Sequence, residues 1–158
     1  MKKKWIIRAI VLVAILSVVT VFLFPHSMLN FSEPISTIKV IIADMDEAGK
    51  IEDTTYEYTP NDDEYSLIVD CLRDYSYRYS FGTIKSFITH NTSHSVGMEG
   101  NDAGYWVNIY LDTATERHTI ICGGTGEIMI DDVVYRVGVI GNNKQLELMR
   151  EIYDIVSP

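Results

Sequence analysis

The acidic residues between positions 44 and 52 have the spacing closest to a known binding chemistry. Asp44, Asp46 and Glu52 surround a turn that contains Gly49, and carboxylates that alternate around a glycine are typical of calcium loops. Ala48 stands where that pattern needs an oxygen ligand, and the preceding residues alternate like a strand and not like a helix. Calcium held by Asp44, Asp46 and Glu52 is therefore an alternative to a solvated acidic hairpin turn.

The two cysteines of the chain are Cys71 and Cys122. In an oxidising compartment, a disulfide between them would close a loop of about 50 residues and stabilise the fold by about 4 kcal/mol. Two free thiols buried in the core are the other interpretation.

Signatures of zinc binding and catalysis are weak. His90 and His94 are four residues apart, as are His118 and Cys122, but neither segment has the composition of a helix that would bring such residues together. The chain has no Gly-x-Ser-x-Gly turn, and its glycine-rich turn at 123–126 lacks the lysine of a phosphate-binding loop. A small cell-surface hydrolase that uses Cys122 or a serine is a further alternative, and we do not favour an enzyme.

Aromatic residues form the remaining candidate surface. Tyr77 and Tyr79 alternate with polar residues, and Trp106 and Tyr110 fall on one face of a predicted strand. Rings on a half-exposed sheet suit the faces of sugars, proline-rich peptides or cationic side chains. Aromatic residues are also good strand formers that help to seal a core. We expect Tyr77, Tyr79, Trp106 and Tyr110 to form a surface for a ligand or partner.

The N-terminal segment predicts a membrane anchor. Residues 5–24 are almost uninterruptedly apolar and follow a basic tip at 1–4, and Arg8 is their only charge. Twenty helical residues span about 30 Å, which matches the hydrocarbon thickness of a bilayer. A cleaved signal peptide is the alternative, but the apolar run is long and no small-x-small cleavage site follows it. We therefore predict an uncleaved, single-pass signal anchor.

The charge distribution predicts which side of the membrane each part occupies. Four of the 13 basic residues precede or begin the apolar run, and the segment 24–36 has none, so the N-terminus should stay in the cytoplasm and the remaining chain should lie outside. Nine basic and 22 acidic residues follow residue 24, which gives that part a net charge of about −13. So acidic a surface excludes nucleic acid as a partner.

The remaining chain predicts one small α+β domain. Residues 25–34 form a tether, and 35–158 have the order ββ-α-βββ(β)-α, with strands expected at 35–42, 51–59, 75–81, 105–112, 118–122 (which runs on through a turn to 127–130) and 133–140. Apolar stripes predict helices after 62 and after 143. Short connections favour an antiparallel sheet with both helices on one face, which leaves the other face for a ligand.

The leading functional hypothesis is a membrane-anchored extracytoplasmic binding module whose partner is a protein, a peptide or a glycan. It has no catalytic signature and needs no cofactor. A calcium-responsive module that uses the 44–52 loop is the alternative, and the cell-surface hydrolase comes third.

Overall fold

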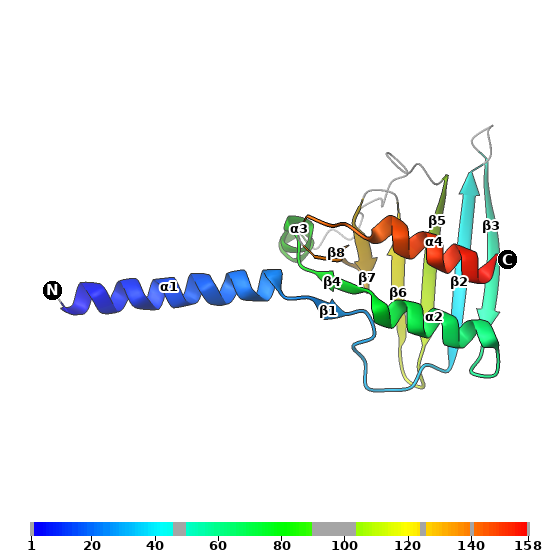
Figure 1. The fold of residues 1–158 in the computed structure, drawn as a ribbon, viewed down its shortest axis with the longest axis horizontal. Coiled ribbons are helices and arrows are strands. Elements are labelled where there is room, and N and C mark those ends of the chain that lie inside the picture. Colours follow the sequence, from blue (N-terminus) through cyan, green and yellow to red (C-terminus); the bar gives the residue numbers. More distant parts are fainter. Residues whose placement is uncertain (1, 46–49, 90–103, 124–125, 140, 158) are drawn as a thin grey trace.

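A computed structural model describes residues 2–45, 50–89, 104–123, 126–139 and 141–157, and shows a mixed α+β domain preceded by one long helix (Figure 1). The helices are α1 (Lys2–Leu23), α2 (Asp63–Asp74), α3 (Phe81–Thr89) and α4 (Gln145–Val156). The strands are β1 (His26–Ser27), β2 (Thr37–Met45), β3 (Ile51–Tyr58), β4 (Ser76–Arg78), β5 (Tyr105–Asp112), β6 (Arg117–Cys122), β7 (Ile128–Ile130) and β8 (Val133–Val137).

The strands form a single sheet in the order β1-β4-β8-β7-β6-β5-β2-β3, and every neighbouring pair is antiparallel. The antiparallel sheet was predicted from the short connections. The order was not, because it places β4 beside β8, which lies far from it in the chain.

Alternate residues of the central strands point to opposite sides of the sheet. Ile38, Val40 and Ile42 of β2 are buried, whereas Lys39 and Ile41 between them are half-buried. Register partners continue the buried side across the sheet with Val107, Ile109, Leu111, Ile120, Cys122, Ile128, Tyr135 and Val137. One side of the sheet is therefore the core side.

Helices α2 and α4 cover the core side, as expected (Figure 1). Ile68 and Leu72 of α2 and Met149 and Ile152 of α4 are fully buried, so the predicted apolar stripes are the ones that pack. Gln145, at the start of α4, is also buried: its amide nitrogen donates to the carbonyl of Gly123, and its Oε1 accepts from the backbone N–H of Gly126 at 3.1 Å. These bonds tie α4 to the β6–β7 connection.

The expected strand at 75–81 is wrong in its second half. Strand β4 ends at Arg78, and α3 begins at Phe81. Ser80 and Thr83 form a reciprocal cap: the Ser80 backbone N–H donates to Thr83 Oγ1 at 2.8 Å, and the Thr83 N–H donates to Ser80 Oγ at 3.3 Å. This cap starts a helix where the alternation of aromatic residues alone indicated a strand.

Helix α3 also changes the expected layout of two helices on one face. It packs on β8, and a Cβ added to Gly82 would come within 3.0 Å of Val134 Cγ1. Val134 pairs with Met129, Met129 pairs with Ile121, and Ile121 pairs with Asn108. Register partners lie on the same side of a sheet, so Val134 lies with Asn108 on the side opposite α2 and α4. The β8 end of that side is therefore covered.

The first helix projects from the domain and contacts it at its C-terminal end. Within it, residues 4–22 have a mean hydropathy of 2.6 and none of them is buried, so by length and composition this helix could cross a membrane.

Candidate functional site

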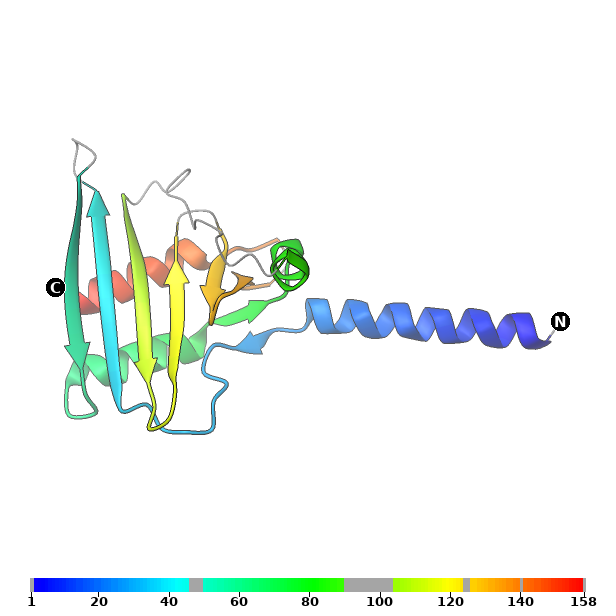
Figure 2. The same cartoon turned by 180° about the vertical axis from the view of Figure 1, so that it is seen from behind.

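The candidate site is the sheet side opposite α2 and α4, across β2, β5 and β6, which we call the open face. Figure 2 shows these strands in front, with α2 and α4 behind them. Trp106, Asn108 and Tyr110 of β5 lie on the open face, because Val107, Ile109 and Leu111 between them are fully buried on the core side. Ile41 of β2 and Ile121 of β6 are the register partners of Asn108.

Trp106 and Tyr110 are four residues apart in one strand, so their Cα atoms lie about 13 Å from each other on the same side. Both side chains are half-buried. The strand thus places one aromatic ring at each end of a surface that carries both polar and apolar side chains. The distance of about 13 Å between these two positions matches the length of about two sugar rings or of a short extended peptide.

Asn108, midway between the two rings, contains an unsatisfied group. Its Oδ1 is buried and accepts no hydrogen bond from the part of the chain that the structure describes. A buried carbonyl oxygen without a partner is unfavourable and is rare in folded proteins. If the Asn108 side chain turns toward the open face, a ligand that donates a hydrogen bond there would satisfy this oxygen.

An ion pair holds the Tyr110 end of the open face. Arg117 donates from Nε to Asp112 Oδ1 at 2.5 Å and from Nη2 to Asp112 Oδ2 at 2.9 Å, and its guanidinium carbon lies 5.8 Å from the centre of the Tyr110 ring. These hydrogen bonds lower the pKa of Asp112 below its ordinary value. The ion pair thereby holds the Arg117 guanidinium over the Tyr110 ring.

Tyr77 and Tyr79, the other predicted surface aromatics, lie elsewhere. Tyr77 stacks on His26 with centroids 5.4 Å apart and contacts Tyr135 at 4.5 Å, while Tyr79 contacts Phe22 of α1 at 5.7 Å. The predicted aromatic surface is thus two separate groups, one on the open face and one where α1 meets the domain.

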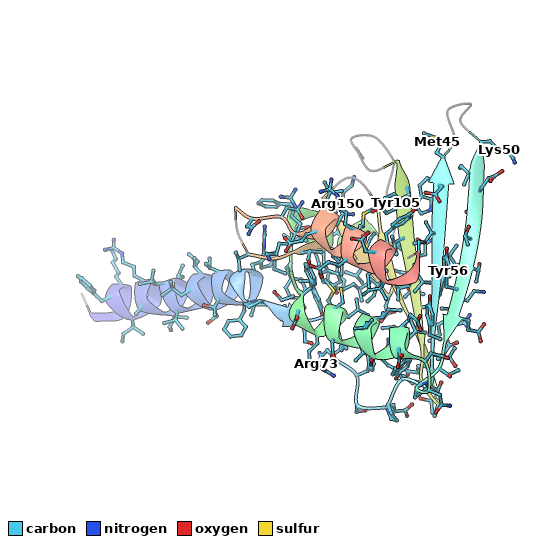
Figure 3. The ribbon with its side chains drawn as sticks, turned by 45° about the vertical axis from the view of Figure 1, so that its right-hand side comes forward. Met45, Lys50, Tyr56, Arg73, Tyr105 and Arg150 are labelled. Carbon is cyan, nitrogen blue, oxygen red and sulfur yellow. The ribbon has the colours of Figure 1, made fainter. Side chains whose placement is uncertain are left out.

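The predicted calcium residues are only partly described. Asp44 and Glu52 face each other as register partners near the end of the β2–β3 hairpin, and Asp46 lies outside the described residues. Lys50 donates to Glu52 at 2.5 Å, and Figure 3 shows Met45 and Lys50 at the end of this hairpin, far from α1. Within the described ranges, no group of three or more His, Cys, Asp or Glu residues could hold a metal ion.

Both cysteines are free and buried in the structure. Cys71 donates to Glu151 Oε2 at 3.4 Å, and desolvation, then this hydrogen bond, raises the pKa of its thiol to about 12. Burial alone raises the pKa of Cys122 to about 12. Both thiols therefore stay protonated at neutral pH, which is the opposite of what a nucleophilic cysteine needs.

Sequence reasoning missed a histidine–aspartate pair. His118 Nδ1 lies 2.8 Å from Asp131 Oδ2, and the His118 ring stacks on Phe31 at 4.6 Å. Asp131 begins the β7–β8 turn with a φ of 45°, which brings its carboxylate to β6. The other ring nitrogen of His118, Nε2, lies 3.8 Å from Glu116. Among the described residues, no hydroxyl or thiol bonds to this nitrogen, so the His118–Asp131 pair has no nucleophile there. The Asp131-Asp132 turn was the only signal in the sequence.

His90 and His94, the other histidine pair, lie outside the described residues. Comparison of the chain with protein families, with curated proteins and with solved structures gives no match.

Proposed function

We propose that this protein is a membrane-anchored binding module that holds its acidic α+β domain outside the cytoplasm and binds a neutral glycan on the open face. The observation that carries the proposal is the arrangement of β5, in which Trp106 and Tyr110 flank the unsatisfied buried oxygen of Asn108.

The length and the hydropathy of α1, and the absence of buried residues between positions 4 and 22, support the anchor. Four basic residues lie at the N-terminal end of this segment, and none lies between 24 and 36, which favours a cytoplasmic N-terminus.

The chemistry of the open face favours a sugar over a charged ligand. Sugar rings present flat C–H surfaces that pack on aromatic rings, and their hydroxyl groups donate to side-chain oxygens such as Asn108 Oδ1. The net charge of about −13 on the outer part of the chain disfavours anionic polymers. Arg117 is already paired with Asp112, so it does not add an uncompensated positive charge to the site.

The hydrolase alternative loses its thiol version, because Cys122 is fully buried on the core side with a raised pKa. A calcium-responsive module would use Asp44, Asp46 and Glu52, and Glu52 is already paired with Lys50.

The test is binding of the full-length chain, in lipid nanodiscs, to an array of purified cell-surface glycans. Wild-type protein should bind a defined set of neutral glycans, and Trp106→Ala and Tyr110→Ala should lose that binding without a large change in Tm. Leu67→Ala is the control, because Leu67 is an exposed apolar residue on α2, on the other side of the sheet. Retained binding in both aromatic variants would reject the open face as the site, and binding of peptides but no glycans would reject the ligand class.

A further inference from the structure

Helix α3 has its apolar and polar sides reversed relative to a helix on the surface of a water-soluble domain. Its outer side exposes Phe81 (90%), Phe87 (56%) and Ile88 (73%), and Ile84 lies on the same side. Its inner side buries Thr83 (1% exposed) and Ser86 (8% exposed) against the domain. A cluster of exposed large apolar side chains on one short helix indicates a surface that something else covers.

Hydrogen bonds fix this orientation. Thr83 Oγ1 donates to the carbonyl of Val134, Ser86 Oγ donates to the carbonyl of Gly82 at 3.0 Å, and the Ser80–Thr83 cap closes the start of the helix. Rotating α3 to bury its apolar side would break the bond from Thr83 to Val134, which joins the helix to β8, and would force a side chain larger than that of Gly82 against Val134. The apolar side therefore points outward as a consequence of the fold.

The position of α3 suggests what covers it. A groove of about 650 Å³ separates it from the end of α1, and the apolar walls come from Val18, Val19 and Phe22 of α1 and from Phe81 and Ile84 of α3. Figures 1 and 2 both show α3 end-on beside the C-terminal end of α1, so α3 runs across the direction of α1. If α1 crosses a bilayer, α3 lies parallel to the membrane surface at the depth where α1 leaves the hydrocarbon.

The polar end of the groove carries two arginines. Arg78 of β4 and Arg136 of β8 are register partners, and both line the groove together with Ser80 and Glu127. Arg136 is 3.6 Å from Glu127, whereas the Nε of Arg78 is buried and has no hydrogen-bond partner within the described residues. A phosphate oxygen is the partner that a guanidinium N–H next to an apolar groove would bind best.

We propose that α3 and the groove beside it are embedded in the outer leaflet of the membrane that α1 crosses, with a phospholipid acyl chain between α1 and α3 and its phosphate at Arg78. Apolar side chains at the boundary between headgroups and acyl chains are the usual contact of an interfacial helix. The net negative charge of the domain is compatible with this contact, because the phospholipid can be zwitterionic. The inference rests on the proposed membrane anchor and adds a second contact, which would hold the domain in one orientation on the membrane.

The test uses full-length chain in phosphatidylcholine vesicles, with the native tryptophans replaced as Trp5→Phe and Trp106→Phe. Three single-tryptophan reporters are then compared: Val13→Trp in the middle of α1, Phe87→Trp on the outer side of α3, and Leu67→Trp on α2 as the exposed control. Vesicles contain lipid brominated either at the middle of the bilayer or close to the headgroup, since bromine quenches tryptophan only on close approach.

We expect deep bromine to quench Val13→Trp, shallow bromine to quench Phe87→Trp, and neither to quench Leu67→Trp. Adding Ile88→Glu should abolish quenching of Phe87→Trp and leave that of Val13→Trp intact. If Val13→Trp is quenched and Phe87→Trp is not, the anchor stands and the leaflet contact is wrong. If Val13→Trp is not quenched, the proposed anchor itself fails. A blue-shifted but unquenched Phe87→Trp would also overturn the inference, because a protein partner or a second copy would then cover α3.

Discussion

The proposed binding surface depends on the two sides of the sheet being different, and two consecutive isoleucines of β2 test this directly. Ile42 is 1% exposed and pairs with Val107 on the core side, whereas Ile41 is half-buried on the open face. Replacing either one by alanine removes the same three carbon groups from the same strand. The two variants therefore differ only in the side of the sheet that loses volume.

The expected magnitudes follow from burial. Removing three fully buried carbon groups costs about 2.4 kcal/mol in transfer free energy, at about 0.8 kcal/mol each. The cavity left under α2 and α4 adds to this, so Ile42→Ala should lower the free energy of unfolding by about 3–4 kcal/mol. Ile41→Ala removes groups that already contact water in part and leaves no enclosed cavity, so it should cost about 1.5–2 kcal/mol.

Urea unfolding in a mild non-ionic detergent, followed by Trp106 fluorescence, measures both values. The same difference should appear as a Tm loss of about 10–15 °C for Ile42→Ala against about 6 °C for Ile41→Ala. Equal losses would show that both sides of the sheet are covered in the folded protein. That result would refute the sidedness and, with it, the open face as a binding surface.

Three other measurements test particular contacts. Gln145→Ala should lower the free energy of unfolding by about 2 kcal/mol, since it removes the acceptor of the half-buried Gly126 N–H and the donor to the buried Gly123 carbonyl, and denaturant titration measures this loss. Cys71 and Cys122 should resist iodoacetamide at pH 8 in the folded chain and react after unfolding, because each pKa is raised to about 12; rapid labelling, read by mass spectrometry, would contradict this burial. Arg117 lowers the pKa of Asp112, so their pairing contributes stability fully above the unfolded aspartate pKa of about 3.9 and loses it as the pH falls through the lower folded value. Arg117→Ala should therefore be less stable than wild type at pH 6, and the difference should shrink between about pH 4 and pH 2; a difference independent of pH would contradict the pairing.

Local patterns were good predictors wherever one side of an element faces the core. The alternation of Val107, Ile109 and Leu111 with Trp106 and Tyr110 correctly placed the two sides of β5. The apolar stripes of α2 and α4 were also correct, because a helix that packs on a sheet must repeat its buried residues at helical spacing.

Helix α3 shows where such patterns fail. Its buried side is polar and its outer side is apolar, so a reading that assigns apolar residues to the core gives the wrong face. The aromatic residues before it alternate as in a strand, and the Ser80–Thr83 cap that starts the helix uses a threonine where the common capping box has glutamate or glutamine. The contacts of α3 with β8, and not its composition, explain this reversal.

The amino-acid sequence was sufficient for the apolar N-terminal helix, the acidic composition of residues 25–158, the α+β class and the sides of its long elements, because each depends on residues close together in the chain. Only the tertiary structure placed Arg78 beside Arg136, His118 beside Asp131, and α3 beside the end of α1. Those contacts join segments that the order of the strands in the sheet brings side by side. Sheet order is decided by how the whole chain packs, and no local repeat encodes it.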